Sequence, residues 1–156
     1  PINFVPERGR ILLCDFRRAR VAPEMDKTRR VVVVSPRSYN ERHGYGPGRC
    51  LVVPFSASHP GDRITPSDVF FARGKYSCLN ADTWAVCSSS MAVSHERLDR
   101  VRVANAFPRE LLSEADLNRI AEGLKHAFGI AIASAKAESR GEEAYLRRYP
   151  FGDLGV

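Results

Sequence analysis

The chain has 156 residues, of which 44% are apolar, and it carries a net charge of +6. This length and apolar content are sufficient for one buried core, so we expect a single domain over residues 1–156. No apolar run approaches the roughly 18 residues of a membrane-spanning helix, and the N-terminal residues lack the apolar core of a signal peptide. We therefore expect a soluble, cytoplasmic protein with no membrane partner.

The first half of the chain predicts three strands separated by two loops. An apolar run over Arg10–Phe16 predicts the first strand, and the charged segment Arg17–Thr28 predicts a long loop. The continuous β-branched run Val31–Ser35 is typical of a strand buried on both faces. Glycine-rich Ser38–Gly48 predicts a turn. Arg49–Ser56 predicts the third strand, and its proline favours an edge or a bulge.

Three shorter apolar segments follow and predict further strands, at Asp68–Ala72, Thr83–Cys87 and Arg100–Val103. Six short strands within about 95 residues favour a small β-barrel over a parallel sheet. We therefore expect the barrel to occupy residues 8–104.

One helix is predicted after the barrel. Ser113 and Asp116 resemble a capping box with aspartate in place of glutamate, and apolar residues follow at helical spacing: Leu117, Ile120, Ala121, Leu124 and Phe128. Good helix formers continue beyond Gly129, so we expect the helix to span residues 113–136. The polar segment 140–156, which contains scattered aromatic residues, is interpreted as a tail or an oligomer arm.

The positive charge is concentrated near the N-terminus. Residues 1–50 carry eleven basic and five acidic side chains, whereas the remaining residues carry thirteen of each sign. Ten of the eleven basic residues are arginines, whose planar guanidinium binds phosphate through two parallel hydrogen bonds. This distribution favours a polyanionic partner such as nucleic acid, and a solvated basic face is the alternative.

The cysteines and histidines form no recognisable site in the sequence. The cysteines lie far apart without a Cys-x-x-Cys pair, so we interpret them as reduced, mostly buried thiols: Cys14, Cys50, Cys78 and Cys87. A zinc site is the less favoured alternative. The histidines show no paired spacing and are interpreted as surface residues. Trp84 and Phe55 could stack on bases, although core packing is favoured for Trp84.

The loop before the second strand carries groups suited to cutting RNA without a metal. In that reaction the ribose 2′-OH attacks the adjacent phosphate, which requires a proton acceptor, a cation for the phosphorane charge and a donor toward the leaving oxygen. Glu24, Lys27 and Arg29 lie within six residues of one another. The third strand ends with the hydroxyl of Ser56, and both strands are rigid supports. A merely solvated loop is the alternative interpretation.

Four sequence elements follow one another at characteristic spacing. A first strand is entered through Arg8-Gly9 and ends near an aspartate (ILLCDF). A loop with a glutamate five residues before an arginine follows (PEMDKTRR). A hydrophobic strand ending in Ser-Pro (VVVVSP) and a later strand with a proline and a hydroxyl residue (CLVVPFSAS) complete the pattern. In this order and spacing, the elements resemble the PemK/MazF toxins of bacterial toxin–antitoxin systems. The resemblance covers Arg8–Ser58 best and extends to WAVCSSSMAVSHERL and the C-terminal helix.

The resemblance implies a mainly β protein with a C-terminal helix, built on an SH3-like small barrel. It also implies an endoribonuclease that cleaves single-stranded RNA without a metal or other cofactor, acts as a homodimer and is blocked by a cognate antitoxin. Glu24 would accept the proton or orient the arginine, Arg29 would stabilise the phosphorane or donate to the leaving group, and Ser56 would bind a phosphate oxygen. Further candidate RNA contacts are Lys27, Arg17, Arg18, Arg20 and Arg30.

Two departures from the family pattern leave alternatives open. Arg30 stands where the family usually has proline, and only one of two successive extended arginines can face the site; we favour Arg29. At the positions of Ser88–Met91 the family often carries an acidic and a basic residue that contact RNA, whereas this chain has three serines and a methionine there. The alternatives are a gyrase-poisoning barrel and an inactive nucleic-acid- or antitoxin-binding barrel of the same superfamily.

Overall fold

The structure is a computed structural model and describes residues 1–17, 21, 24–41, 47–58 and 64–130. Its strands are β1 (Ile11–Asp15), β2 (Thr28–Val33), β3 (Arg49–Ser56), β4 (Asp68–Phe71), β5 (Thr83–Val86), β6 (Met91–Ser94) and β7 (Leu98–Arg100). Its helices are the short α1 (Arg37–Asn40), the 3-10 turns η2 (Cys87–Ser89) and η3 (His95–Arg97), and α2 (Glu114–Ala127).

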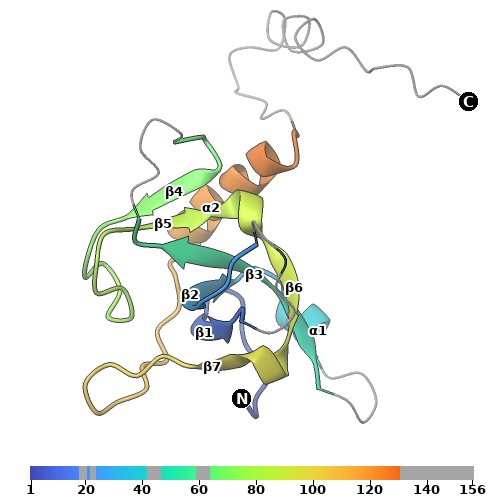
Figure 1. The fold of residues 1–156 in the computed structure, drawn as a ribbon, viewed down its shortest axis with the longest axis vertical. Helices are drawn as coiled ribbons and strands as arrows, with labels where there is room; N and C mark the ends of the chain where they lie inside the picture. The colour runs from blue at the N-terminus through green and yellow to red at the C-terminus, as the bar shows by residue number, and fades with distance from the viewer. Residues whose placement is uncertain (18–20, 22–23, 42–46, 59–63, 131–156) are drawn as a thin grey trace, which may run out of the picture.

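The strands form one antiparallel sheet in the order β4-β5-β3-β2-β1-β7, and β6 pairs with β3 outside this path (Figure 1). The mainly β architecture with a C-terminal helix is therefore confirmed. The predicted SH3-like small barrel is not confirmed, because the sheet does not close: its end strands β4 and β7 do not pair within the described residues.

Strand β3 changes partner along its length, and this change explains how a proline is accommodated in a central strand. Residues Arg49–Val52 pair with β6, and the last two residues pair with β5. The backbone N–H and C=O of Leu51 both bond on the β2 side, to the Ser35 hydroxyl and to the N–H of Val34. Backbone direction alternates along a strand, so the nitrogen of Pro54 is turned to the opposite side, into the gap between β6 and β5. The proline thus occupies a local edge inside a central strand.

The sheet buries a core on each of its two faces. Val31, Val32 and Val33 of β2 are all 0% exposed, with Val32 on one face and the other two on the opposite face. We call the cluster that contains Val32 the helix-side core, because α2 contributes Leu117 and Ile120 to it. We call the other, which contains Ile2, Leu12 and Val52, the N-terminal core. The prediction of a strand buried on both faces is confirmed.

Several predicted boundaries are wrong. Strand β2 begins at Thr28 rather than Val31, so Arg29 and Arg30 belong to the strand and not to the loop. The predicted turn at Ser38–Gly48 contains the end of α1, because the amide of buried Asn40 donates to the Pro6 carbonyl at 2.8 Å and holds the chain there. The last predicted strand is shifted, since β7 ends at Arg100.

Strand β6 was not expected as a separate strand. Its four residues pair with the first four residues of β3, and this long-range pairing stabilises a segment that has no extended apolar run. In Figure 1, β6 descends along one side of β3 and leads through η3 into β7. It therefore gives β3 a second neighbour where β5 does not reach.

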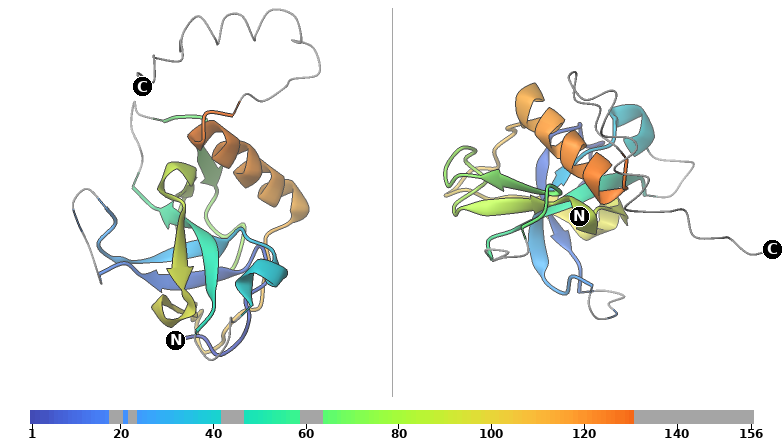
Figure 2. Two further views of the ribbon diagram at one scale, coloured as in Figure 1. Left: turned by 90° about the vertical axis from the view of Figure 1, so that its right-hand side faces the viewer. Right: turned by 90° about the horizontal axis from the view of Figure 1, so that it is seen from above.

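Helix α2 begins at the predicted capping box. The Ser113 hydroxyl accepts a hydrogen bond from the N–H of Asp116 at 3.2 Å. The helix lies at the end of the molecule away from the N-terminus (Figure 2). It packs on β4 and η2. The packing is close at Gly123, where a Cβ atom would lie 2.7 Å from the sulfur of Cys87. The helix ends at Ala127, and Phe128 is 66% exposed instead of buried. Residues 131–136 and 140–156 of the predicted helix and tail lie outside the described residues.

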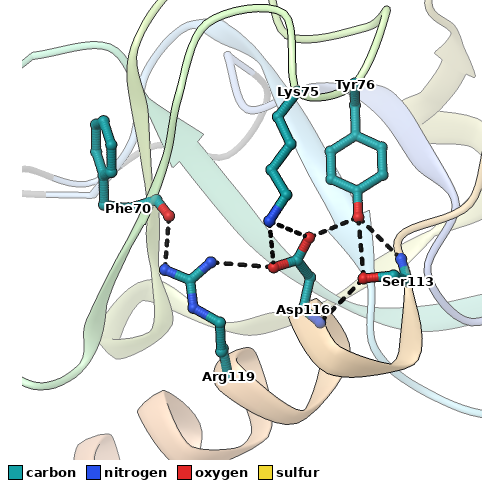
Figure 3. Close-up of polar contacts among 6 residues, drawn as sticks. All are labelled: Phe70, Lys75, Tyr76, Ser113, Asp116 and Arg119. Carbon is teal, nitrogen blue, oxygen red and sulfur yellow. Dashed lines mark hydrogen bonds and ion pairs between the residues drawn. The ribbon is translucent and has the colours of Figure 1, made fainter.

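Asp116 is a buried carboxylate that joins α2 to the segment after β4 (Figure 3). Its oxygens accept hydrogen bonds from Lys75 Nζ at 2.8 Å, Tyr76 OH at 2.6 Å and Arg119 Nη1 at 3.0 Å. Burial alone would raise the pKa of Asp116, but these three donors outweigh it and lower the pKa to about 2. Arg119 also donates to the Phe70 carbonyl at 2.8 Å, so the network anchors the outer strand β4.

Among the described residues, no helix has the length and apolar character needed to cross a membrane.

Candidate active site

Arg29 and Ser56 lie at the same end of one face of the sheet, on neighbouring strands. The β2–β3 ladder ends at the pair Val31–Pro54. Two residues beyond this pair are Arg29 in β2 and Ser56 in β3. Side chains alternate between the faces of a strand, so Arg29 and Ser56 both share the face of Val31 and Pro54. The fold therefore brings the predicted arginine and the predicted hydroxyl to corresponding positions of two strands.

Arg30 takes the alternate position, on the face of Val32 and the helix-side core. A hollow of about 180 Å³ opens here between β2, the end of β3 and the segment before β5. Its lining comprises Leu13, Thr28, Arg29, Arg30, Phe55, Ala57, Leu79, Asn80, Ala81 and Thr83. Both Arg29 and Arg30 contribute to the lining of this hollow.

The two guanidinium groups are electrostatically unsatisfied within the described part of the chain. Arg29 and Arg30 are half-buried, and the Nε of each is buried without a hydrogen-bond partner. None of the ion pairs between described residues involves either of them. A buried donor left unpaired costs about 1–3 kcal/mol. An anion bound at this part of β2 would supply the missing acceptors.

Glu24 and Lys27 do not join Arg29 and Ser56. Glu24 is exposed, and its carboxylate accepts a long hydrogen bond of 3.4 Å from the N–H of Val21, in its own loop. Lys27 is also exposed and makes no hydrogen bond or ion pair with another described residue. Both lie on the loop that leads into β2, so they remain near the strand without contributing to a preformed constellation.

The arginines of the first loop are only partly described. Arg17 forms two side-chain hydrogen bonds to Asp15, each of 2.9 Å, and its side chain is 68% exposed. The hydrogen bond and charge of Asp15 raise the pKa of Arg17. Arg17 is therefore already neutralised by a carboxylate and is a weaker phosphate ligand than its charge alone indicates. Arg18 and Arg20 lie outside the described residues.

An aromatic pair extends the face that carries Ser56. Ser56 pairs with Trp84 of β5, and Trp84 pairs with Phe70 of β4, so the three side chains lie in one row across three strands. The rings of Phe70 and Trp84 are 5.3 Å apart, and Phe70 is 42% exposed. Sequence reasoning missed Phe70, although the alternation in Asp68–Phe71 contained the signal: Val69 and Phe71 are buried and Phe70 is not. Phe55, the other aromatic considered for stacking, is buried in the helix-side core.

The prediction that the histidines are surface residues is wrong for His95. His95 is 2% exposed, packed against Gly48, and is not the predicted surface residue. A Cβ on Gly48 would lie 2.6 Å from the His95 ring, which shows how closely this turn is packed. His126 is exposed on α2 as expected, and His43 and His59 lie outside the described residues.

The cysteines are free and buried, as predicted. Burial raises the pKa of Cys14 to about 11 and the pKa values of Cys50 and Cys87 to about 12, so these thiols stay protonated at neutral pH. Burial also raises the pKa of Cys78. Within the described ranges, no three His, Cys, Asp or Glu side chains gather as metal ligands.

The segment Ser88–Met91, where the sequence departs from the family, connects β5 to β6. Its serines belong to η2 and its cap, and Met91 begins β6 opposite Val52. Ser88 and Met91 are exposed, so this segment presents hydroxyl and thioether groups where the family pattern has charges. No charged side chain of this segment is available to contact a polyanion.

One family of known proteins matches most of this chain. A family model described as the PemK-like, MazF-like toxin of type II toxin–antitoxin systems matches residues 7–128. No curated protein sequence matches the chain.

Several solved structures share the fold. MazF (Form-I) from Deinococcus radiodurans has a TM-score of 0.60 and 18% identity, covering 81% of this chain and 99% of that one. An endoribonuclease in complex with its cognate antitoxin, from a mycobacterial species, has a TM-score of 0.55 and 18% identity, covering 82% and 99%. The Mycobacterium tuberculosis toxin MazF-mt6 has a TM-score of 0.53 and 17% identity, covering 79% and 99%. Because the family model spans most of the chain, this protein belongs to the PemK-like, MazF-like toxin family of type II toxin–antitoxin systems.

Proposed function

We propose that this protein is an endoribonuclease that cuts single-stranded RNA by attack of the ribose 2′-OH, without a metal. The observation that carries the proposal is the pair of half-buried arginines on β2 whose Nε atoms have no hydrogen-bond partner among the described residues, with the Ser56 hydroxyl at the matching position of β3. Cationic donors fixed on a rigid strand are what a developing phosphorane charge requires. Family membership and neighbours that are named endoribonucleases support the same activity.

Each residue has a chemical role in this proposal. Arg29 binds the scissile phosphate and stabilises the charge that builds on its oxygens, or donates a proton to the leaving 5′ oxygen. The Ser56 hydroxyl donates to a second phosphate oxygen and fixes the phosphate beside Arg29. Glu24 accepts the 2′-OH proton or orients Arg29, and because it is exposed on its loop, its contribution requires the RNA to bring the loop and β2 together.

The remaining basic residues hold the RNA backbone in this proposal. Arg30 and Lys27 flank Arg29, and Arg17, Arg18 and Arg20 supply positive charge in the preceding loop. Contacts of this kind make affinity strongly dependent on salt. The family also supports a homodimer, a cytoplasmic location and a cognate antitoxin that blocks the RNA site; one structural neighbour is a complex of an endoribonuclease with its antitoxin.

The Phe70–Trp84 pair lies beside Ser56 and is proposed to stack on RNA bases. Replacing Phe70 by alanine is expected to weaken binding of an unstructured RNA by about 5- to 100-fold, because stacking on an aromatic ring contributes about 1–3 kcal/mol per base. Fluorescence anisotropy with a labelled, uncleavable 2′-deoxy oligonucleotide measures this affinity. Phe128→Ala is the matched control, since Phe128 is equally aromatic and 66% exposed but lies at the end of α2. Equal affinity of the Phe70→Ala variant and the wild type would remove the stacking role.

Attack by the 2′-OH is tested by comparing an RNA substrate with a DNA strand of the same sequence. In EDTA, the purified protein is expected to cut an unstructured RNA oligonucleotide and to leave the all-deoxy oligonucleotide of the same sequence intact, because the deoxy strand has no nucleophile. Comparable cutting of both strands would reject 2′-OH attack. Binding of the RNA without cutting, at any divalent-ion concentration, would favour the inactive nucleic-acid-binding alternative instead.

A further inference from the structure

A second basic cleft lies where the N-terminal segment meets the end of β7 and the segment before α2. It has a volume of about 320 Å³, within the lower part of the range of small-molecule sites. It is lined by Phe4, Val5, Glu7, Arg10, Arg37, Arg100, Phe107 and Arg109. Four of these eight side chains are guanidinium groups, and one is a carboxylate.

Arg10 is the buried member of this cluster. Arg10 is only 9% exposed, and its Nε is buried without a hydrogen-bond partner among the described residues. Burial lowers the pKa of Arg10; Arg109 and Arg100 act in the same direction, whereas Cys78 and Glu7 oppose them. An arginine remains charged even so. The Nε–H of Arg10 is therefore a donor without an acceptor in the described part of the chain, an arrangement that an anionic ligand would complete.

The single carboxylate does not neutralise the cleft. Glu7 lies 3.6 Å from Arg37, and both side chains are more than half exposed. Among the described residues, the Arg100 guanidinium makes one long hydrogen bond of 3.4 Å, to the Asn3 side chain, and Arg109 forms no ion pair. Arg10, Arg100 and Arg109 thus line the cleft without an ion pair to any described carboxylate, and together they favour a ligand with two negative charges.

Aromatic rings form the other part of the lining. The guanidinium carbons of Arg10 and Arg100 lie 5.9 and 5.2 Å from the centre of the Phe4 ring. Phe107, which also lines the cleft, is 51% exposed. Planar guanidinium and phenyl groups both stack on nucleobases, and guanidinium groups bind phosphate oxygens in pairs.

We propose that this cleft binds a nucleotide through a terminal phosphate monoester, with Arg10, Arg100 and Arg109 on the phosphate and Phe4 or Phe107 against the base. The ligand is either a free mononucleotide or the 5′-phosphorylated end of an RNA strand, since both present the same phosphate and base. The cleft is separate from the proposed cleavage site, because its lining includes neither Arg29 nor Ser56 and shares no residue with the hollow that Arg29 and Arg30 line. Arg10 precedes β1, whereas Arg29 pairs with Cys14 near the other end of that strand.

Calorimetric titration of the full chain with 5′-AMP, adenosine and inorganic phosphate tests the ligand class. We expect 5′-AMP to bind at least 10-fold more tightly than adenosine, because adenosine lacks the phosphate, and at least 10-fold more tightly than inorganic phosphate, which lacks the base. Equal affinity for 5′-AMP and adenosine, or no binding of 5′-AMP, would overturn the proposal. Equal affinity for 5′-AMP and inorganic phosphate would reduce the site to an anion site and overturn the nucleotide assignment.

Variants of the exposed arginines locate the binding without disturbing the fold. Arg100→Gln and Arg109→Gln are each expected to weaken 5′-AMP binding about 10-fold. Arg73→Gln, the same charge change at an exposed position outside the cleft, should leave it unchanged. Arg29→Ala should also retain 5′-AMP binding, so failure of this proposal is distinguishable from failure of the proposed nuclease. Unchanged affinity in both cleft variants would contradict the assignment.

The source of the nucleotide is resolved by a pair of short deoxy oligonucleotides, with and without a 5′ phosphate. Tighter binding of the phosphorylated strand than of 5′-AMP, lost in Arg109→Gln, identifies the end of a nucleic-acid strand as the ligand. Tighter binding of 5′-AMP identifies the free nucleotide. Equal binding of the two strands, unaffected by Arg109→Gln, would show that the cleft does not recognise a terminal phosphate and would contradict the proposal.

Discussion

Replacing Arg29 by alanine is expected to lower the rate of RNA cleavage by about 10²–10³-fold while leaving the fold intact. The magnitude follows from the loss of one preorganised donor to the charge that develops on the phosphate. Arg29 is half-buried, has an unpartnered Nε and forms no ion pair with a described residue, so its removal leaves no carboxylate unpaired. Single-turnover cleavage of an unstructured RNA in EDTA measures the effect, with thermal unfolding as the check on the fold.

The neighbouring arginine provides the sharpest control. Arg30→Ala makes the same chemical change one residue away, on the opposite face of β2, and should slow cleavage less than about 10-fold. Arg73→Ala, at an exposed position remote from β2, should have no effect. If Arg30→Ala abolishes cleavage and Arg29→Ala does not, the reacting phosphate binds on the hollow side of β2, and the assignment of Arg29 and Ser56 is wrong.

Replacing Asp116 by asparagine is expected to lower the free energy of unfolding at neutral pH by about 2–3 kcal/mol. Asparagine preserves the shape of the side chain but removes the charge that Lys75 and Arg119 share (Figure 3). It also weakens the bond from Tyr76 OH, which is 2.6 Å long. Urea unfolding followed by circular dichroism measures the change. Glu114→Gln is the matched control, because it removes one negative charge from the same helical turn at an exposed position, and should shift stability by less than about 0.5 kcal/mol.

The same network gives the protein a defined acid sensitivity. The pKa of Asp116 is lowered from 3.8 to about 2 in the folded protein, so the folded state favours the ionised form. The stabilisation is therefore fully present above about pH 4 and is lost as the pH falls toward 2. The wild type should lose stability relative to Asp116→Asn across this window. If the difference between the two proteins is constant from pH 5 to pH 2, Asp116 does not contribute as a paired carboxylate.

Local sequence patterns were sufficient to predict the parts of the fold that depend on local chemistry. Arg49–Ser56 was predicted with its observed bounds, because a β-branched, apolar run between turn residues has few other conformations. The capping residues of α2 were predicted for a similar reason, since Ser113 bonds to a residue three positions away. The position of Ser56 at the end of β3 was therefore accessible from the sequence, whereas Arg29 was expected in the loop and lies in β2.

The features that sequence reasoning missed depend on distant partners. Strand β6 exists because it pairs with the start of β3, and the burial of His95 depends on packing against Gly48. Asp116 was interpreted only as a capping residue, yet its main partners, Lys75 and Tyr76, come from the segment after β4. The basic cleft was missed because Arg10, Arg100 and Arg109 converge only when the N-terminal segment lies beside β7, through the bond from Ile2 N–H to the Leu98 carbonyl.

The ends of the RNA fragments test the proposed chemistry most directly. Attack by the 2′-OH breaks the bond from phosphorus to the 5′ oxygen, so each cut should leave a 2′,3′-cyclic phosphate, or the phosphate formed when it opens, and a 5′-hydroxyl. Mass spectrometry of fragments from a defined RNA, cut by the wild type in EDTA and compared with an Arg29→Ala digest, measures both ends. We expect cyclic phosphate and 5′-hydroxyl ends that disappear with Arg29. Fragments with 3′-hydroxyl and 5′-phosphate ends would contradict the mechanism.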